Sequence, residues 1–215
     1  MEPSPVRALL IDIGGVILTK GWDRHARKHA AEKFGYNHDE VEDRHDIAVH
    51  TYEEGYMTLD QYLDHVVFFN ERRFLREDYK TFMFSQSKPY PDMLHLFTEL
   101  KTTYGMKVIA LSNEGRDLAI HRVHTFNLTQ FIDFFVISSF VHYRKPDSRM
   151  FHMALDQVLL PMDSVIYIDD TPMHVEVAQG LGIPAIVHVD YQTTSAALRE
   201  ILNHPSNKLQ VLECE

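Results

Sequence analysis

Groups suited to phosphoryl chemistry occur at four separated points of this 215-residue sequence. Carboxylates are ligands that Mg²⁺ prefers, whereas hydroxyl, amide and ammonium groups can donate to phosphate oxygens. Taken singly, each group could be a helix cap or a turn residue. Packed into one crevice, however, three carboxylates and a lysine would be costly unless a cation and an anion lay between them. The groups are Asp12, the pair Ser112 and Asn113, Lys145, and the pair Asp169 and Asp170.

Five short apolar runs, three of which end directly before these groups, have the length and β-branched content of strands buried on both faces. Amphipathic stretches at 116–126, 147–160 and 172–181 alternate with the last four runs, as expected for βαβ units. The fold class is therefore predicted to be α/β, with a doubly wound parallel sheet that binds ligands at the carboxyl ends of its strands. The expected strands are 6–11, 107–111, 134–138, 164–168 and 184–189.

The first gap between strands is far longer than one crossover helix requires. Its apolar residues follow helical spacing only, which predicts a small all-helical cap domain at 20–88 inserted into a core domain of 1–19 and 89–215. A helix at 91–100 should lead back into the sheet, and the tail after Pro205 is expected to be an edge strand or loose. The helices expected in the cap are 23–34, 39–54, 59–70 and 76–84.

Composition argues against several classes of partner. The formal net charge of −10 disfavours nucleic acid and anionic membranes, because both require a basic face. The single cysteine, Cys214, cannot form an intrachain disulfide, and the opening residues lack the basic region of a signal peptide. The apolar run around Asp12 is too short and too polar for a membrane span. We therefore expect a cytoplasmic protein, monomeric or homodimeric, whose partner is a small phosphorylated metabolite.

Together and in this order, the four groups resemble the motifs of the haloacid dehalogenase-like hydrolases, and the match covers most of the chain outside the expected cap. A helical cap after the first motif is similar to the subgroup that contains sugar-phosphate phosphatases, phosphoglycolate phosphatases, the phosphatase domain of soluble epoxide hydrolase and the 2-haloacid dehalogenases. The resemblance implies a Rossmann-like core and a Mg²⁺-dependent phosphatase that forms an aspartyl-phosphate on Asp12.

The resemblance also implies roles for the remaining site residues. Lys145 would offset the repulsion between an anionic nucleophile and an anionic substrate, since this reaction is catalysed mainly by positioning and charge neutralisation. Gly14 and Gly15 would permit a tight turn and close backbone approach to metal and phosphate. The implied Mg²⁺ ligands are Asp12, the carbonyl of Gly14, Asp170, and Asp169 directly or through water. The implied phosphate-binding groups are Ser112, Asn113, Lys145 and Gly15.

One departure from the family pattern lies two residues after the nucleophile, where phosphatases of this superfamily usually carry a second Asp as general acid. This chain has Gly14. Because a positioned acid typically contributes about 10²–10⁴-fold, we expect a bias towards sugar phosphates or other esters with good leaving groups. Two alternatives stay open: a metal-independent 2-haloacid dehalogenase, and a catalytically impaired protein that only binds its ligand.

Substrate-selecting residues are expected in the cap. Arg24 and Tyr56 are the candidates for substrate contact, whereas Trp22 and Tyr52 lie at helical spacing typical of core aromatics.

Overall fold

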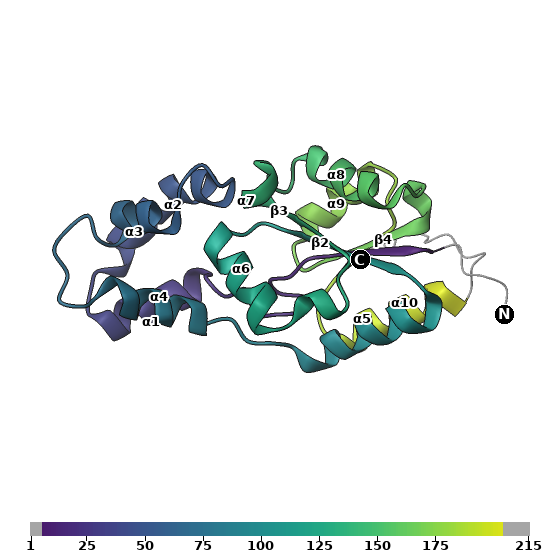
Figure 1. Cartoon of the computed structure of the whole chain (residues 1–215), viewed down its shortest axis with the longest axis horizontal. Helices are drawn as coiled ribbons and strands as arrows, with labels where there is room; N and C mark the ends of the chain where they lie inside the picture. Colours follow the sequence, from purple (N-terminus) through teal and green to yellow (C-terminus); the bar gives the residue numbers. More distant parts are fainter. Residues whose placement is uncertain (1–5, 204–215) are drawn as a thin grey trace, which may run out of the picture.

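The computed structural model describes residues 6–203 and has a five-stranded parallel sheet at its centre (Figure 1). The strands are β1 (Ala8–Ile11), β2 (Lys107–Ser112), β3 (Phe134–Ile137), β4 (Val165–Asp169) and β5 (Ala185–Val187). Their order is β3-β2-β1-β4-β5, so the chain adds strands on one side of β1 and then on the other. This order confirms the predicted doubly wound sheet, and the strand bounds differ from the expected ones by at most two residues.

Helices cover both faces of the sheet, which is why the strands are apolar on both sides. In β1, Leu9 and Ile11 face one core while Ala8 and Leu10 face the other. Side chains of α5, α6 and α10 fill the first core, and those of α8 and α9 fill the second. The bounds are α5 (Pro91–Tyr104), α6 (Arg116–Thr125), α8 (Ser148–Val158), α9 (Pro172–Gly180) and α10 (Tyr191–Asn203). Three shorter turns of helix are η1 (Leu128–Gln130), α7 (Ser138–Val141) and η2 (Met162–Ser164).

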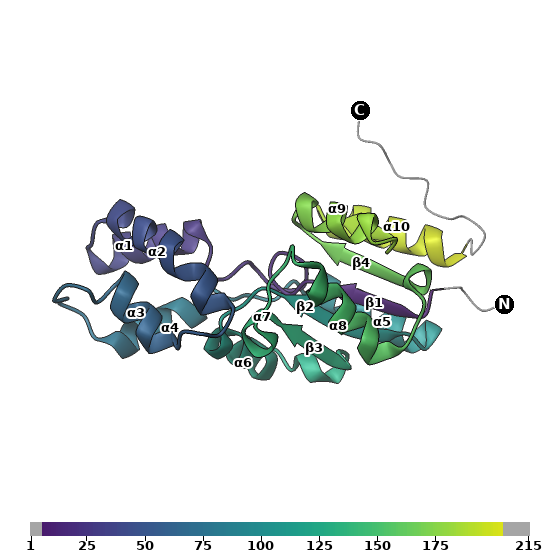
Figure 2. The same cartoon turned by 90° about the horizontal axis from the view of Figure 1, so that it is seen from above.

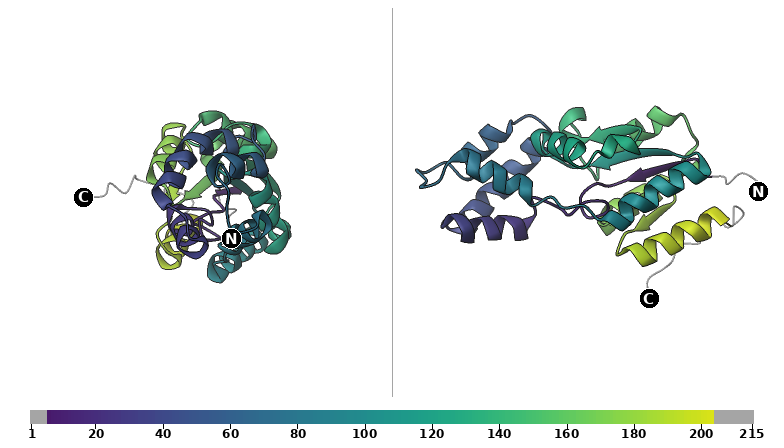
Figure 3. Two further views of the ribbon diagram at one scale, coloured as in Figure 1. Left: turned by 90° about the vertical axis from the view of Figure 1, so that its left-hand side faces the viewer. Right: turned by 60° about the horizontal axis from the view of Figure 1, so that its bottom comes forward.

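Helix α10 was not among the expected elements. It lies beside α5 on one face of the sheet (Figure 3). Its start is stabilised by Asp190, whose Oδ1 accepts from the backbone N–H of Thr193 at 2.8 Å. The prediction for the tail after Pro205 lies outside the described residues.

Four further helices form a separate lobe between β1 and α5 (Figures 1 and 2). This helical lobe has its own aromatic core, which includes Trp22, Tyr62 and Tyr79. The third helix is shorter than expected: it ends at Val66, and the carbonyl of Val67 accepts from Arg72 Nε at 2.7 Å. The bounds are α1 (Arg24–Phe34), α2 (His38–Glu53), α3 (Leu59–Val66) and α4 (Arg76–Ser85). All four fall inside the predicted cap segment, and the exact domain bounds stay a prediction.

The helical lobe meets the sheet domain along two links and at one end of α2. The two linking segments pair with each other, since the Thr19 N–H donates to the Lys88 carbonyl at 2.8 Å. At the end of α2, Gly55 has a φ of +74°, and a Cβ there would overlap the backbone of Ser139 in α7. Close packing of α2 on α7 therefore depends on this glycine.

Within residues 6–203, no helix combines the length and the apolar character needed to cross a membrane.

Candidate active site

The polar groups expected at the strand ends do meet at one edge of the sheet. Asp12 directly follows β1, Ser112 is the last residue of β2, and Asp169 ends β4. The register aligns Ile11 with Ile168, and the Asp12 N–H donates to the Ile168 carbonyl at 2.9 Å. Consequently the ends of β1 and β4 present their carboxylates side by side, where a doubly wound sheet forms its ligand crevice.

Three carboxylates form a cluster at this edge. Oxygens of Asp12, Asp169 and Asp170 all lie within 4.8 Å of one another. Asp12 is 8% exposed and Asp169 is fully buried. Buried carboxylates at this separation repel one another strongly, and a hard divalent cation with oxygen ligands would relieve that repulsion. The donor set thus fits Mg²⁺.

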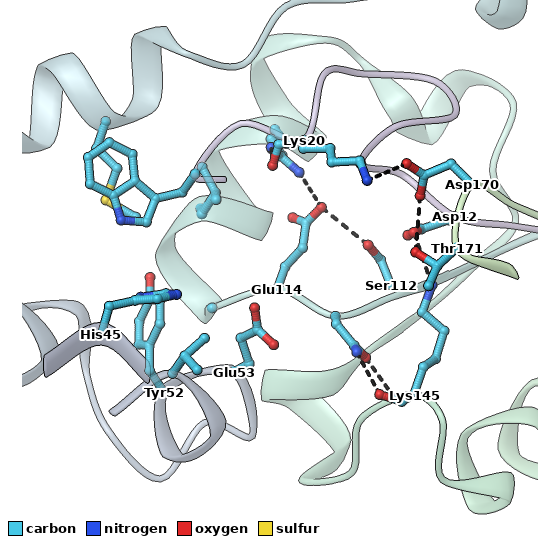
Figure 4. Close-up of a pocket in the computed structure, with 18 of the residues that line it drawn as sticks. Asp12, Lys20, His45, Tyr52, Glu53, Ser112, Glu114, Lys145, Asp170 and Thr171 are labelled. Carbon is cyan, nitrogen blue, oxygen red and sulfur yellow. Dashed lines mark hydrogen bonds and ion pairs between the residues drawn. The ribbon is translucent and has the colours of Figure 1, made fainter. Parts of the chain in front are cut away.

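Lys145 reaches this cluster from the loop before α8 (Figure 4). Its Nζ lies 3.1 Å from Asp12 Oδ2 and 2.5 Å from Asp169 Oδ2, with the side chain fully buried. Burial would lower the pKa of Lys145, but the two carboxylates outweigh it and hold the pKa above its ordinary value. Burial also raises the pKa of Asp12 to about 6, against the opposing charge of Lys145. The lysine is therefore a fixed cation beside the candidate nucleophile.

Asp169 has protein partners for both of its oxygens. It accepts from Lys145, from the Tyr167 hydroxyl and from the backbone N–H of Thr171 at 2.7 Å, and His174 Nδ1 lies 3.2 Å away. Although burial would raise the pKa of Asp169, Lys145 and these donors hold it well below its usual range. Such a carboxylate stays ionised and orients Lys145.

Asp170, by contrast, is only lightly engaged. Its partners are Lys20 Nζ at 2.7 Å, from a side chain that is 53% exposed, and the Thr171 hydroxyl at 3.4 Å. Gly15, with a φ of +87°, leaves room for the Asp170 carboxylate, which a Cβ at that position would overlap. The Gly15 N–H itself donates to the Leu18 carbonyl at 2.7 Å. Asp170 thus has fewer protein partners than Asp169, and its main partner is a side chain half exposed to solvent.

Asn113 acts on the backbone of Lys145. Its Nδ2 donates to the Lys145 carbonyl at 2.9 Å and its Oδ1 accepts from the Lys145 N–H at 2.8 Å. The neighbouring Ser112 hydroxyl lies 3.3 Å from Glu114 Oε1 and is 1% exposed as a residue. Asn113 therefore ties the end of β2 to the lysine loop.

A buried arginine occupies the region beside Gly14. A Cβ at Gly14 would lie 3.5 Å from Arg122 Nη1, so a side chain at this position would be in van der Waals contact with the guanidinium. Arg122 donates to Glu114 at 2.5 Å, to Ser87 Oγ at 3.0 Å, and to backbone carbonyls of the linking segment. Sequence patterns did not single out Arg122 or Glu114, although Glu114 directly follows the Ser-Asn pair.

A cavity of about 180 Å³ extends from the strand ends to the helical lobe (Figure 4). Trp22 Nε1 donates to the Tyr62 hydroxyl at 3.3 Å, and that hydroxyl lies 2.7 Å from His45 Nδ1. Burial lowers the pKa of His45 to about 4, so the ring is neutral and can accept from Tyr62. The lining from the lobe side is Trp22, His45, Val49, Tyr52, Glu53, Tyr62 and Met83.

The residues expected to contact substrate from the cap do not lie at this cavity. Neither Arg24 nor Tyr56 lines this cavity, since Arg24 points towards Glu42 and Tyr56 stacks on His142 while staying 65% exposed. Trp22 and Tyr52, expected to be core residues, line it instead while also belonging to the lobe core.

Comparison with known proteins identifies this arrangement. A family model described as haloacid dehalogenase-like hydrolase matches residues 12–188. No curated protein matches the sequence. Among solved structures, a HAD family enzyme from Bacteroides thetaiotaomicron, in complex with magnesium and inorganic phosphate, is 21% identical with a TM-score of 0.74, covering 88% of this chain and 98% of that one.

Two further solved structures represent different activities. A HAD phosphatase from Thermococcus onnurineus is 18% identical with a TM-score of 0.63, covering 92% of this chain and 98% of that one. A defluorinating L-2-haloacid dehalogenase is 17% identical with a TM-score of 0.64, covering 92% and 98%. At these identities the likeness shows a shared fold.

Proposed function

The chain belongs to the haloacid dehalogenase-like hydrolases, and within that family of enzymes we propose that it is a magnesium-dependent phosphatase for a small phosphorylated metabolite, such as a sugar phosphate. The observation that carries this proposal is the cluster of Asp12 with Asp169 and Asp170 around Lys145. A nucleophile that attacks carbon needs no metal, so a second lightly engaged carboxylate such as Asp170 would only add repulsion.

The two residues of the acidic pair have different roles in this proposal: Asp170 binds the metal and Asp169 orients Lys145. Asp12, Asp170 and the carbonyl of Gly14 would hold Mg²⁺, which supplies charge neutralisation to the phosphoryl group when bound. Asp169 already has donors on both oxygens, so it orients Lys145 in preference to binding the metal.

Asp12 attacks the substrate phosphorus in this proposal. One carboxylate oxygen forms a bond to phosphorus while the bond from phosphorus to the alcohol oxygen breaks, giving an aspartyl-phosphate. Water then hydrolyses this intermediate, which releases phosphate and restores the carboxylate. The backbone N–H of Ile13 donates to Asp12 Oδ1 at 2.7 Å, which fixes the orientation of the nucleophile.

Lys145 and the Ser112 hydroxyl would hold the phosphoryl oxygens that are not transferred. Asn113 contributes by fixing the lysine backbone through its two hydrogen bonds. Positioning of this kind accounts for much of the catalysis of phosphoryl transfer.

Gly14 provides no proton for the departing alcohol. The neighbouring Arg122 is a cation and a hydrogen-bond donor, but it does not release its proton at physiological pH. Turnover should therefore be fastest for esters whose alcohol is easily expelled, as at the anomeric carbon of a sugar.

The proposal is tested by a phosphometabolite screen with Mg²⁺, run in parallel on the wild type and Asp12→Asn. Phosphate release by the wild type alone, abolished by chelator, is the expected result. Halide release from 2-haloacids that survives chelator would contradict it and favour the dehalogenase activity.

A further inference from the structure

The cavity beyond the phosphoryl site contains buried polar atoms without protein partners. We propose that Glu114 and Tyr52 are specificity-determining residues that bind hydroxyl groups on the alcohol part of the substrate, which is a neutral, polyhydroxylated compound. This inference rests on the proposed phosphatase function. Both residues are 4% exposed and both line the cavity.

Glu114 offers an unused acceptor beside the phosphoryl site. Its Oε1 is occupied by Arg122 at 2.5 Å and by the Ser112 hydroxyl at 3.3 Å. Within residues 6–203, its Oε2 is buried and has no hydrogen-bond partner. A buried carboxylate oxygen without a hydrogen-bond donor costs free energy, so a ligand group that donates to this oxygen would be bound favourably.

Tyr52 offers a second unused group opposite the first. Its hydroxyl is buried and has no hydrogen-bond partner in the described part of the chain. Burial raises the pKa of Tyr52 well above its ordinary value, so the phenol is neutral and can both donate and accept. A Cβ at Gly115 would overlap the end of the Tyr52 ring, which places the hydroxyl against the residue that follows Glu114.

The relative positions of these groups fit an alcohol bonded to the phosphoryl group. Ser112 lies at the strand end next to Asp12, and Glu114 continues from it towards the helical lobe (Figure 4). Tyr52 approaches from the lobe side, in α2. The alcohol part of a bound ester would therefore pass Glu114 first and then reach Tyr52.

Charge balance selects a neutral alcohol. Arg122 pairs with Glu114 at 2.5 Å, and Arg144 pairs with Glu53 at 2.7 Å. Each carboxylate on this side of the cavity thus has its own guanidinium, so neither an unpaired cation nor an unpaired carboxylate group is left there to bind a second anion or an ammonium. A ligand carboxylate would also meet the unpaired Oε2 of Glu114 and be repelled.

The experiment uses Tyr52→Phe, which removes only the unpartnered hydroxyl. Kinetics are compared on a hexose phosphate and on 4-nitrophenyl phosphate, whose alcohol has no additional hydroxyl. We expect KM for the hexose phosphate to rise about tenfold, the effect of one lost hydrogen bond, while kcat/KM for the aryl ester changes by less than about twofold. The melting temperature should not fall, because the folded protein loses no bond.

A matched control is Tyr79→Phe in the same lobe. The Tyr79 hydroxyl lies 2.8 Å from the Tyr36 hydroxyl and outside the cavity lining, so its loss should lower stability without changing the ratio between the two substrates. Glu114→Gln provides a second variant, since it exchanges the carboxylate for an amide of similar shape. Because Glu114 Oε1 also accepts from Arg122 and Ser112, this variant can affect both substrates, but KM should rise more for the hexose phosphate than for the aryl ester.

The outcomes distinguish a failure of this inference from a failure of the proposed phosphatase function. If Tyr52→Phe and Glu114→Gln change both substrates equally, or neither, the inference is overturned while the phosphatase function stands. Preference for phosphoglycolate or phosphoethanolamine over neutral polyol phosphates would overturn it as well. If the wild type releases no phosphate from any ester with Mg²⁺, the proposed function fails and the inference fails with it.

Discussion

Replacement of Asp170 by Asn should abolish the stabilisation that Mg²⁺ gives to the folded protein. Of the three clustered carboxylates, Asp170 has the weakest interactions with other protein groups, because its main partner is the half-exposed Lys20. Asp169 by contrast supports Lys145, so changing it would disturb the site even without metal. Asp170→Asn therefore removes a metal ligand at the smallest structural cost.

The size of the effect follows from the charges and from linkage. Without metal, three carboxylates face two lysines, Lys145 and Lys20, so the cluster has an excess negative charge. At a Mg²⁺ concentration about 100 times its Kd, binding to the folded state stabilises by about 2.7 kcal/mol. For a chain of this size that corresponds to a rise in melting temperature of roughly 5–11 °C. The variant should rise by less than about 2 °C, because one of two carboxylate ligands is lost.

Thermal unfolding followed by circular dichroism, with Mg²⁺ and with chelator, measures this difference. Asp156→Asn, at an exposed position on α8, makes the same change of charge away from the site and should respond like the wild type. An equal rise in Asp170→Asn and the wild type would refute the assignment of this residue. The absence of any rise in the wild type would refute the metal site as a whole.

Two further predictions concern Glu53 and Gly14. Burial raises the pKa of Glu53 from 4.5 to about 7, despite the charge of Arg144 and with a contribution from Glu114. The folded state then binds this proton more tightly than the unfolded chain, so the free energy of unfolding should fall by up to about 3 kcal/mol as the pH rises from 4.5 to above 7. Urea unfolding across this range should show a smaller fall in Glu53→Gln, and equal slopes would contradict the assignment. Gly14→Asp should not give the ~10²-fold gain in kcat/KM on alkyl phosphates that a general acid supplies, because Arg122 would keep the new carboxylate ionised. Steady-state kinetics with glycerol phosphate would detect such a gain.

Much of the fold could be predicted because its strands are buried on both faces. The run 164–168 is apolar at nearly every position, and β4 occupies Val165–Asp169. Where tertiary contacts decide where a helix ends, the apolar pattern of the sequence was less informative. Phe68 continues the apolar periodicity of α3, yet the helix ends at Val66 because the chain turns to pack Phe68 on Phe74 and Tyr79.

The strand pattern located the site residues that follow strands directly, and the order of the motifs added Lys145 in the loop before α8. Asp12 and Asp169 could be located in this way, since parallel strands deliver their carboxyl ends to one edge. Lys20 and Tyr52 gave no comparable signal, because each reaches the cavity from a segment whose position relative to the sheet is set by long-range packing. Tyr52 was expected in the core and is indeed 4% exposed, but it also lines the cavity.

The lack of an acid at position 14 is connected with the position of Arg122, which lies next to Gly14. Arg122 donates to the carbonyls of Thr19 and Lys20, in the segment that links the sheet to the helical lobe. Gly21 makes room for it, since a Cβ there would overlap the guanidinium. A carboxylate at position 14 would begin 3.5 Å from Arg122 Nη1 and would compete for the cation that secures this link. An acid at position 14 would therefore form an ion pair with the arginine that secures this link, and such an ionised carboxylate could not donate a proton beside the nucleophile.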